Sequence, residues 1–235
     1  MAKHEEFHIL REKLEIPSVN ANVPRPRLAR LLRRSRQLFP ATLITGRAGT
    51  GKTALAVAFA RKTENVSWYT VEATDADWSV FARYFSESLT RSGIADPNAE
   101  PGSVLGNVSA GDIALFLLRH FFQTETQSKV SSPLIVLDDV HHIFDADWFE
   151  EFFNLLIYSL PRDAHILMLC RSKPPAPMWR MRSKQMLNVL DEKEIAFDAN
   201  ETRGLFRVLG LSATAAETAR QKSFGRISKL LQFAR

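Results

Sequence analysis

Cysteine is almost absent from this sequence: Cys170 is the only one in 235 residues, so no disulfide can form within the chain. Long hydrophobic runs are also absent, and no stretch approaches the roughly 18 apolar residues of a membrane-spanning helix. Residues 1–6 are mostly polar and lack the apolar stretch of a secretory signal peptide. These absences predict a soluble, cytoplasmic protein without a membrane partner.

The remaining composition is that of a globular domain. Hydrophobic residues make up 45% of the chain and charged residues 24%, which excludes a wholly disordered or fibrous protein. A folded chain of this length buries roughly 70% of its unfolded surface and needs no disulfide or metal. The formal net charge of +5 is compatible with a phosphate-bearing ligand or with nucleic acid, and does not choose between them.

Apolar runs alternate with amphipathic segments along most of the chain. Five runs rich in β-formers indicate strands, and the continuously apolar ones are typical of strands buried in a parallel sheet. The segments between them have the apolar spacing of helices. This order predicts a doubly wound α/β fold with a mainly parallel sheet, with strands at residues 41–45, 66–71, 134–137, 165–170 and 186–190 and helices at 27–39, 52–62, 78–89, 112–122 and 148–160.

The two ends of the chain differ in pattern from this α/β core. Residues 1–19 are mixed in charge and predict an irregular lead-in, and residues 20–195 are assigned to the nucleotide-binding domain. Within that domain, glycines and prolines predict a long loop at 92–111 and a stiff connection at 174–177. Residues 196–235 predict a small helical lid domain, with helices at 202–209, 213–222 and 226–234.

The strongest motif lies between the first predicted strand and the following helix. Residues 46–53 read Gly-Arg-Ala-Gly-Thr-Gly-Lys-Thr, the phosphate-loop pattern of a glycine, four residues and then Gly-Lys-Thr. Glycines let successive backbone N–H groups converge on phosphate oxygens, and the next helix adds its positive dipole end. Lys52 would neutralise the β- and γ-phosphates, and the Thr53 hydroxyl would bind Mg²⁺. We therefore predict that ATP or ADP binds here with Mg²⁺, in contact with Gly46, Arg47, Ala48, Gly49, Thr50, Gly51, Lys52, Thr53 and Ala54.

Charged residues end the third and fourth predicted strands. Asp138 is expected at the carboxyl edge of the sheet, where it would hold Mg²⁺ through water together with Thr53. For Asp139 two interpretations stay open: it polarises an attacking water, or it caps the turn that follows. Arg171 is expected to reach the γ-phosphate, because a planar guanidinium suits phosphate oxygens. The predicted catalytic residues are Lys52, Asp138, Asp139 and Arg171.

Other conspicuous residues have simpler interpretations. Six arginines at residues 25–36 would suit a nucleic-acid stripe, but leucines at helical spacing among them favour a solvated basic face. His141 and His142 lack a second cluster at metal-ligand spacing and are expected to be solvated. Asp75 and Asp77 follow the second strand, where starting a helix is favoured over contact with the nucleotide. Cys170 is expected in the core.

The order of these motifs resembles the nucleotide-binding module of STAND signalling ATPases. Within that class the chain is most similar to the maltose activators and the large LuxR-type ATP-binding transcriptional regulators of bacteria. Many proteins share the phosphate loop, whereas the Arg-Pro-Arg-Leu lead-in, the Asp-Asp-x-His turn and the Arg-Ser-x-Pro-Pro turn narrow the resemblance. It extends over about residues 13–233 and depends on residues 23–28, 43–53, 66–69, 137–141 and 170–175.

The resemblance implies a switch between ADP-bound and ATP-bound forms, with slow Mg²⁺-dependent hydrolysis. In that class the segment before the first strand packs near the adenine, which implies contacts from Val23, Pro24 and Arg25. The lid closes on the nucleotide through a motif that is often Gly-x-Pro, and this chain has Gly225-Arg226-Ile227 there. Self-association in the ATP form is also implied, and DNA binding would come only from domains outside this sequence.

Two other classes remain as alternatives to a switch module of a bacterial signalling or transcriptional regulator. A P-loop small-molecule kinase would need an acceptor site with its own acid or base, and no second constellation accompanies Asp138 and Asp139. An AAA+-like, DNA-associated ATPase would need a trans-acting arginine and DNA binding by the basic stretch at residues 25–36.

Overall fold

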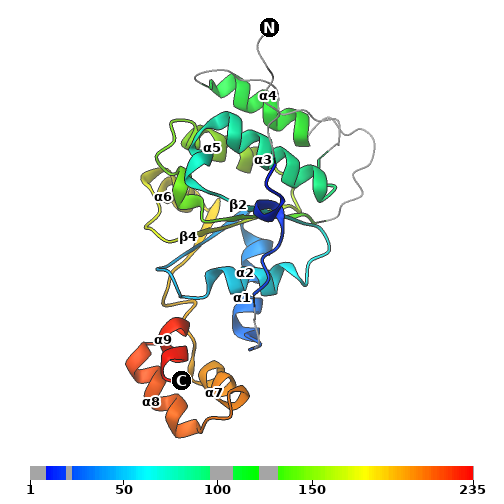
Figure 1. The fold of residues 1–235 in the computed structure, drawn as a ribbon. Helices are drawn as coiled ribbons and strands as arrows, with labels where there is room; N and C mark the ends of the chain where they lie inside the picture. The colour runs from blue at the N-terminus through cyan, green and yellow to red at the C-terminus, as the bar shows by residue number, and fades with distance from the viewer. Residues whose placement is uncertain (1–8, 20–22, 96–107, 122–131, 235) are drawn as a thin grey trace.

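A five-stranded parallel sheet lies at the centre of the protein, as Figure 1 shows. The computed structural model describes residues 9–19, 23–95, 108–121 and 132–234. The strands lie in the order β2-β3-β4-β1-β5, so β1 has neighbours that are distant in sequence. Their bounds are Ala41–Thr45 (β1), Val66–Thr70 (β2), Leu134–Asp138 (β3), His165–Cys170 (β4) and Leu187–Leu190 (β5). The predicted α/β fold with a mainly parallel sheet is confirmed.

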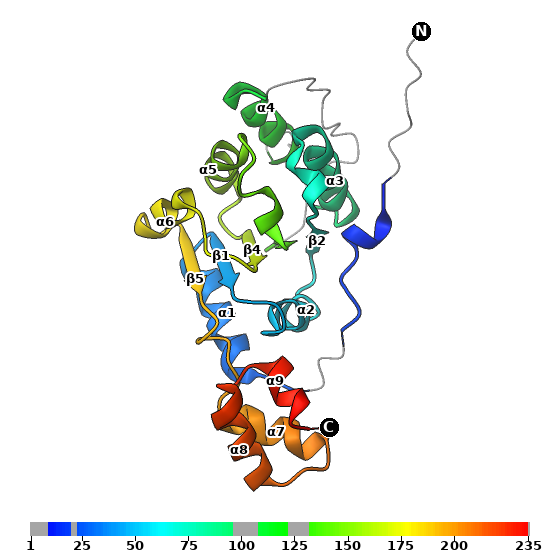
Figure 2. The ribbon, with the colours of Figure 1, turned by 60° about the vertical axis from the view of Figure 1, so that its left-hand side comes forward.

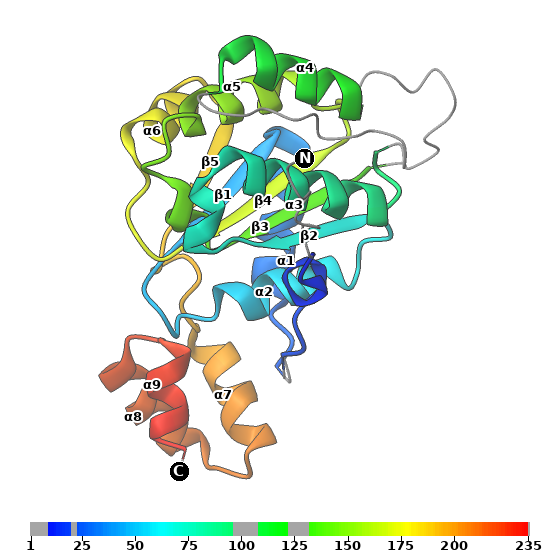
Figure 3. The same ribbon diagram turned by 45° about the horizontal axis from the view of Figure 1, so that its top comes forward.

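Helices cover both faces of this sheet (Figures 1 and 3). Along β3, Leu134 and Val136 pack into the core on one face, while Ile135 and Leu137 pack into the core on the other. Both faces are therefore dry, which explains why the strands are apolar at nearly every position. One face carries α1 (Pro26–Leu38) and α2 (Lys52–Ala60); the other carries α3 (Trp78–Arg91), α5 (Phe149–Ser159) and α6 (Ala176–Ser183), with α4 (Ala110–Phe121) outside α5.

The lead-in packs beside β2 and forms a buried ion pair with the segment that follows this strand. Lys13, in the short 3₁₀ helix η1 (Arg11–Leu14), donates from Nζ to both carboxylate oxygens of Asp75 at 2.6 and 2.7 Å. Asp75 is fully buried in a second 3₁₀ helix, η2 (Ala73–Ala76), and therefore neither starts α3 nor lies free at the sheet edge. Asp77 alone caps α3, accepting from the backbone N–H groups of Ser79 and Val80.

Most element bounds differ from the predicted ones by one to three residues, and two segments differ in kind. The proline-rich stretch at 174–177 was expected to be a stiff connection, but α6 begins within it at Ala176. Pro177 occupies the first turn of that helix, where the missing N–H of proline has no cost. The expected loop at 92–111 includes residues 96–107, which lie outside the described residues, and α4 already begins at Ala110. A third 3₁₀ helix, η3 (Val140–Ile143), follows β3.

The C-terminal helices form a small body beside the carboxyl edge of the sheet, as Figure 2 shows. They are α7 (Ala199–Val208), α8 (Ala213–Ser223) and α9 (Ile227–Gln232), and together with the preceding Phe197 they enclose a separate apolar core. Ile195, two residues earlier, still packs with α1 and α2. We call these helices the lid, and residues 191–198 the linker; the predicted domain bounds themselves stay a prediction. No described helix is long and apolar enough to cross a membrane.

A polar network is buried near the amino ends of β1 and β4. His165 donates from Nδ1 to the carbonyl oxygen of Phe39 at 2.9 Å, and its Nε2 accepts from the Thr42 hydroxyl at 2.9 Å. Thr42 in turn accepts from the Ser35 hydroxyl at 2.6 Å, which accepts from the Asn188 amide. Neutral His165 is thus fully satisfied, and burial lowers its pKa to about 4.

We predict that His165 makes the free energy of unfolding depend on pH. In the unfolded chain the pKa of histidine is about 6.5, so the unfolded form takes up a proton first as the pH falls. The stabilisation from neutral His165 is present in full above that pH and is lost as the pH falls towards 4. The loss is about 3 kcal/mol across this window.

Urea unfolding of the wild type and His165→Gln between pH 7.5 and 4.5 measures this loss. The glutamine variant should have the shallower dependence on pH. Replacement of the exposed His142 by Gln serves as the control and should follow the wild type. Parallel curves for the wild type and His165→Gln would contradict the prediction.

Candidate nucleotide-binding site

The phosphate loop, residues 46–53, connects β1 to α2 at the carboxyl edge of the sheet. Gly49 and Gly51 have φ values of +74° and +89°, which glycine adopts without strain. The Lys52 side chain is buried, and its Nζ donates to the carbonyl oxygens of Gly46 at 2.7 Å and Arg47 at 3.2 Å. Burial lowers the pKa of Lys52. The loop therefore wraps its backbone around one ammonium group at the carboxyl edge of the sheet.

Thr53 and Asp138, the two predicted metal ligands, are in direct contact. The Thr53 hydroxyl donates to Oδ2 of Asp138 at 2.9 Å, and the backbone N–H of Asp139 donates to Oδ1 at 2.9 Å. Asp138 is buried, and this burial, together with the nearby Asp139 carboxylate, raises its pKa to about 6. The hydrogen-bond donors to this desolvated carboxylate are a hydroxyl and a backbone N–H, and a second carboxylate lies beside it, an environment that suits a divalent cation. The residues at this point fit Mg²⁺.

Asp139 and Arg171 form a bidentate ion pair. Nε and Nη2 of Arg171 donate to the two Asp139 oxygens at 3.0 and 2.7 Å. Asp139 has a left-handed backbone (φ +56°) at the start of η3, and Arg171 is half-exposed at the end of β4. The order of the strands brings both residues together, because β3 and β4 are neighbours in the sheet. Their roles as base and phosphate contact stay predictions.

Arg47 points away from the interior of the loop and pairs with the linker. Its Nε and Nη2 donate to the two Glu192 oxygens at 3.1 and 2.9 Å, and its backbone N–H also donates to Glu192. The Thr50 hydroxyl donates back to the Arg47 carbonyl at 2.9 Å. Glu192 was not among the predicted site residues, since it follows the last strand and belongs to no motif.

The lid lies directly against the phosphate loop. The backbone N–H of Ser228 donates to the Gly49 carbonyl at 3.1 Å, and the Arg226 guanidinium donates to the Ala48 carbonyl. A Cβ atom on Gly49 would lie 2.7 Å from Oγ of Ser228, so glycine is also required for this close approach. Loop, linker and lid together border a cleft of about 1090 Å³. The lid motif predicted from the sequence is therefore in contact with the loop backbone.

The residues expected near the adenine contact the linker and lid instead of standing free. Val23 packs against the apolar core of the lid. The Arg25 guanidinium donates to the carboxylate of Glu201, in α7, at 2.8 Å. Nothing in the motifs pointed to Glu201, whose partner is distant in sequence. Contacts from Val23, Pro24 and Arg25 to the base stay a prediction.

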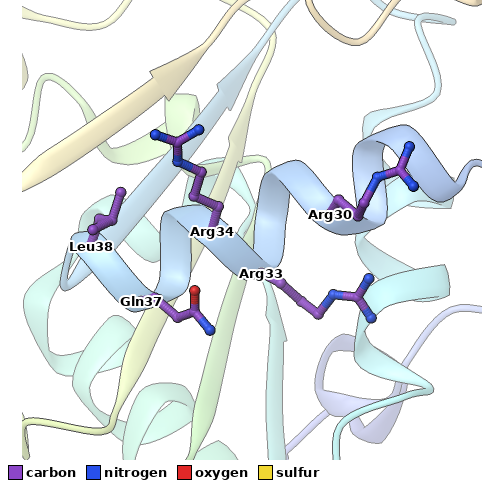
Figure 4. A pocket seen from close by; sticks show the side chains of 5 residues that line it. All are labelled: Arg30, Arg33, Arg34, Gln37 and Leu38. Carbon is purple, nitrogen blue, oxygen red and sulfur yellow. The ribbon is translucent and has the colours of Figure 1, made fainter.

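The basic stretch at residues 25–36 does not form one continuous face. Arg25 and Arg27 bind the linker and lid, and Arg36 donates to the Ser132 carbonyl. The three exposed arginines project from α1 beside a hollow of about 540 Å³, and Figure 4 shows all three, with Arg33 and Arg34 pointing in different directions. The solvated basic face is therefore limited to Arg30, Arg33 and Arg34.

The remaining conspicuous residues have no ligand-binding geometry. His142 is exposed, and Nδ1 of His141 lies 3.7 Å from Asp139. In the part of the chain that the structure describes, no group of three or more His, Cys, Asp or Glu side chains is placed to hold a metal ion. Cys170 is buried, as expected of a core residue.

Residues 25–169 match a family described as the AAA ATPase domain. The chain belongs to this family. Among curated proteins, this chain is similar to the HTH-type transcriptional regulator MalT of Vibrio parahaemolyticus. The two are 24% identical over 188 residues, which cover 78% of this chain and 20% of MalT. MalT of Yersinia enterocolitica is 25% identical over 165 residues, covering 70% and 18%. The chain thus spans about a fifth of the length of these relatives.

Two solved structures share the fold of the AAA ATPase domain. A STAND protein with a tetratricopeptide repeat sensor from Pyrococcus horikoshii matches with a TM-score of 0.59 and 20% identity, over 91% of this chain and 30% of that one. A Walker-type ATPase of Pyrococcus abyssi matches with a TM-score of 0.55 and 12% identity, over 90% and 66%. The predicted P-loop fold and the resemblance to STAND ATPases and maltose activators are confirmed.

We predict that Gly225→Ala destabilises the protein far more than Gly210→Ala. Both glycines have positive φ, +75° and +73°, so alanine is strained at either position. A Cβ at Gly225 would also lie 2.9 Å from the Phe197 nitrogen, whereas nothing lies within 4 Å at Gly210. Unfolding should show losses of about 3 and about 1 kcal/mol respectively. Equal losses would mean that the close approach of lid and linker is not a constraint.

We predict that Asp138→Asn removes most of the effect of Mg²⁺ on nucleotide affinity. The variant lacks the carboxylate charge that a divalent cation would neutralise, so ATP should bind about tenfold more weakly than to wild type when Mg²⁺ is present. When a chelator removes Mg²⁺, calorimetry should show the same ATP affinity for the variant and the wild type. The exposed Asp145 provides the control variant Asp145→Asn. Retention of the full Mg²⁺ effect by Asp138→Asn would contradict this assignment.

Proposed function

We propose that this domain binds an adenine nucleotide with Mg²⁺ and acts as the STAND-type switch of a cytoplasmic transcriptional regulator. The observation that carries the proposal is the contact of the lid with the phosphate loop itself, through Ser228 on Gly49 and Arg226 on Ala48. A ligand that changes the backbone of this loop must therefore change the contact with the lid. Such a differential contact is what shifts a population between two states.

Within the loop, the backbone N–H groups and Lys52 would hold the phosphates. The Lys52 ammonium donates to two loop carbonyls, and phosphate oxygens would replace these acceptors. Thr53 and Asp138 would hold Mg²⁺, which supplies positive charge to the phosphate oxygens when bound. These groups would bind and orient the nucleotide. Water would then be the acceptor of the γ-phosphoryl group.

The ion pair between Arg171 and Asp139 gives a physical reason for slow hydrolysis. While Arg171 donates to both Asp139 oxygens, an attacking water has to compete with the guanidinium for that carboxylate. A γ-phosphate would compete with Asp139 for the half-exposed guanidinium. Release of Asp139 would then occur only with the triphosphate, so that hydrolysis would return the pair to its starting arrangement.

The regulator as a whole is proposed from its relatives. MalT is named as an HTH-type transcriptional regulator, and this domain matches about a fifth of it. We place DNA contacts in parts of the protein outside the domain and self-association in its ATP-bound form. The exposed basic face of α1 is small for a DNA-binding surface, with three arginines.

The proposal is tested by Lys52→Ala and titration calorimetry with ATP and ADP. Loss of the buried ammonium should weaken both nucleotides about 100-fold, since a charge-assisted contact to phosphate contributes about 3 kcal/mol. Lys62→Ala, an exposed lysine beyond the end of α2, is the matched control. Unchanged affinities in Lys52→Ala would remove the basis of the proposal.

A second measurement separates a switch from an enzyme of rapid turnover. Mass spectrometry of the nucleotide released from purified protein should find ADP in near-stoichiometric amount. Protein without retained nucleotide, together with rapid multiple turnover, would contradict the switch.

A further inference from the structure

Arg25 is bound on several sides by its own chain. Its Nη2 donates to the carbonyl oxygens of Ile195 at 2.8 Å and Ala196 at 2.9 Å, and to Oε2 of Glu201 at 2.8 Å. Its guanidinium carbon lies 3.9 Å from the centre of the Phe197 ring. The side chain is only 10% exposed. One residue of the core thus contacts both the linker and the first helix of the lid.

Arg27 repeats these contacts from the first turn of α1. It donates to the carbonyl oxygens of Glu194 and Ala196, both at 2.8 Å, and to the same Glu201 oxygen at 3.1 Å. Its Nε lies 3.3 Å from the Asp198 carboxylate. Two guanidinium groups therefore converge on one carboxylate and on the backbone of the linker.

Glu201 also makes hydrogen bonds at the start of the lid, all of them through Oε2 and its backbone. It is buried, and its Oε2 accepts from the backbone N–H of Asp198 at 3.1 Å, while its own N–H donates to the Asp198 carboxylate at 2.8 Å. This reciprocal cap fixes the carboxylate to the first turn of α7. The position of Glu201 therefore sets the position of the helix.

A short path leads from Arg25 to the phosphate loop. Phe197, on which Arg25 stacks, donates from its backbone N–H to the Gly225 carbonyl at 2.9 Å. The next residue is Arg226, which donates to the Ala48 carbonyl of the loop. The contacts of Arg25 with the linker thus lie close to the point where the lid reaches the loop.

We propose that Arg25, Arg27 and Glu201 form a hinge clamp that sets the position of the lid on the phosphate loop. Arg25 is then a positioning residue and does not bind the adenine, because its Nη2 and one face of its guanidinium are already engaged by the linker and lid. The consequence for nucleotide affinity rests on the proposed function. The consequence for the position of the lid does not.

The first test measures the lid in protein freed of nucleotide. Spin labels at Lys62→Cys in the core and Glu217→Cys in the lid lie on exposed positions, and the only native cysteine is buried. Arg25→Gln and Glu201→Gln should each broaden the distance distribution and lengthen its mean. Arg30→Gln, at an exposed arginine of α1, is the control and should leave the distance distribution unchanged. If Arg25 acted only by contacting the adenine, its replacement would not change the distance between the labels in nucleotide-free protein. An unchanged distance distribution therefore overturns the clamp.

The second test measures nucleotide affinity. Arg25→Gln and Glu201→Gln should each weaken ATP binding about tenfold, and the double variant should be no weaker than either, because each change opens the same clamp. The affinity for inorganic triphosphate should fall in parallel with the affinity for ATP, because the lid contacts the loop that would hold the phosphates and not the base. Weakening of ATP alone by Arg25→Gln would show a base contact and overturn the proposal.

Two controls keep the result interpretable. Arg25→Lys retains the charge but not the fork of donors, and it should give a distance distribution between those of wild type and Arg25→Gln. This variant serves if circular dichroism shows that a glutamine variant is unfolded. Failure of the proposed function would appear separately, as nucleotide affinity unaffected by Lys52→Ala while the distance changes persist.

Discussion

The left-handed backbone of the phosphate loop is the constraint on which the rest of the site depends. Glycine at positions 49 and 51 lets the loop turn inward around the Lys52 ammonium and still present its outer carbonyls to the lid. At Gly49 the missing side chain is needed twice, for the backbone angle and for the approach of Ser228. A single stretch of backbone therefore encloses the Lys52 ammonium on one side and contacts the lid on the other.

The charged side chains around the loop differ in burial: two ion pairs are partly exposed, and one carboxylate is buried. Arg47 with Glu192 and Arg171 with Asp139 are bidentate but partly exposed, so solvent screens them and either pair can exchange partners at modest cost. Asp138 is buried without such a cationic partner, and its neighbour in space is a hydroxyl. The site thus combines exchangeable arginines with one fixed carboxylate.

Motif spacing and apolar periodicity predicted those parts of the fold that depend on neighbouring residues in the sequence. The phosphate loop, Asp138 and the five strands follow from spacing and from apolar runs, and they lie where expected because both sheet faces are buried. The partners of Lys13, Arg47 and Arg25 did not follow, since they lie 62, 145 and 176 residues away. Periodicity carries no information on such pairs. Helix α6 does not follow from the pattern either, because a proline-rich stretch is typical of a stiff connection, whereas Pro177 lies in the first turn of the helix.

The buried pair of Lys13 and Asp75 has a consequence for how the domain can be handled. β2 is an edge strand, and η1 packs against it while Lys13 lies over the ring of Tyr84. A fragment beginning after residue 14 would lose this cover and leave a carboxylate with no counter-ion inside the protein. It would also present an open strand to other copies, the usual route to aggregation. A recombinant fragment of this domain that is meant to stay monomeric therefore has to include the first 3₁₀ turn.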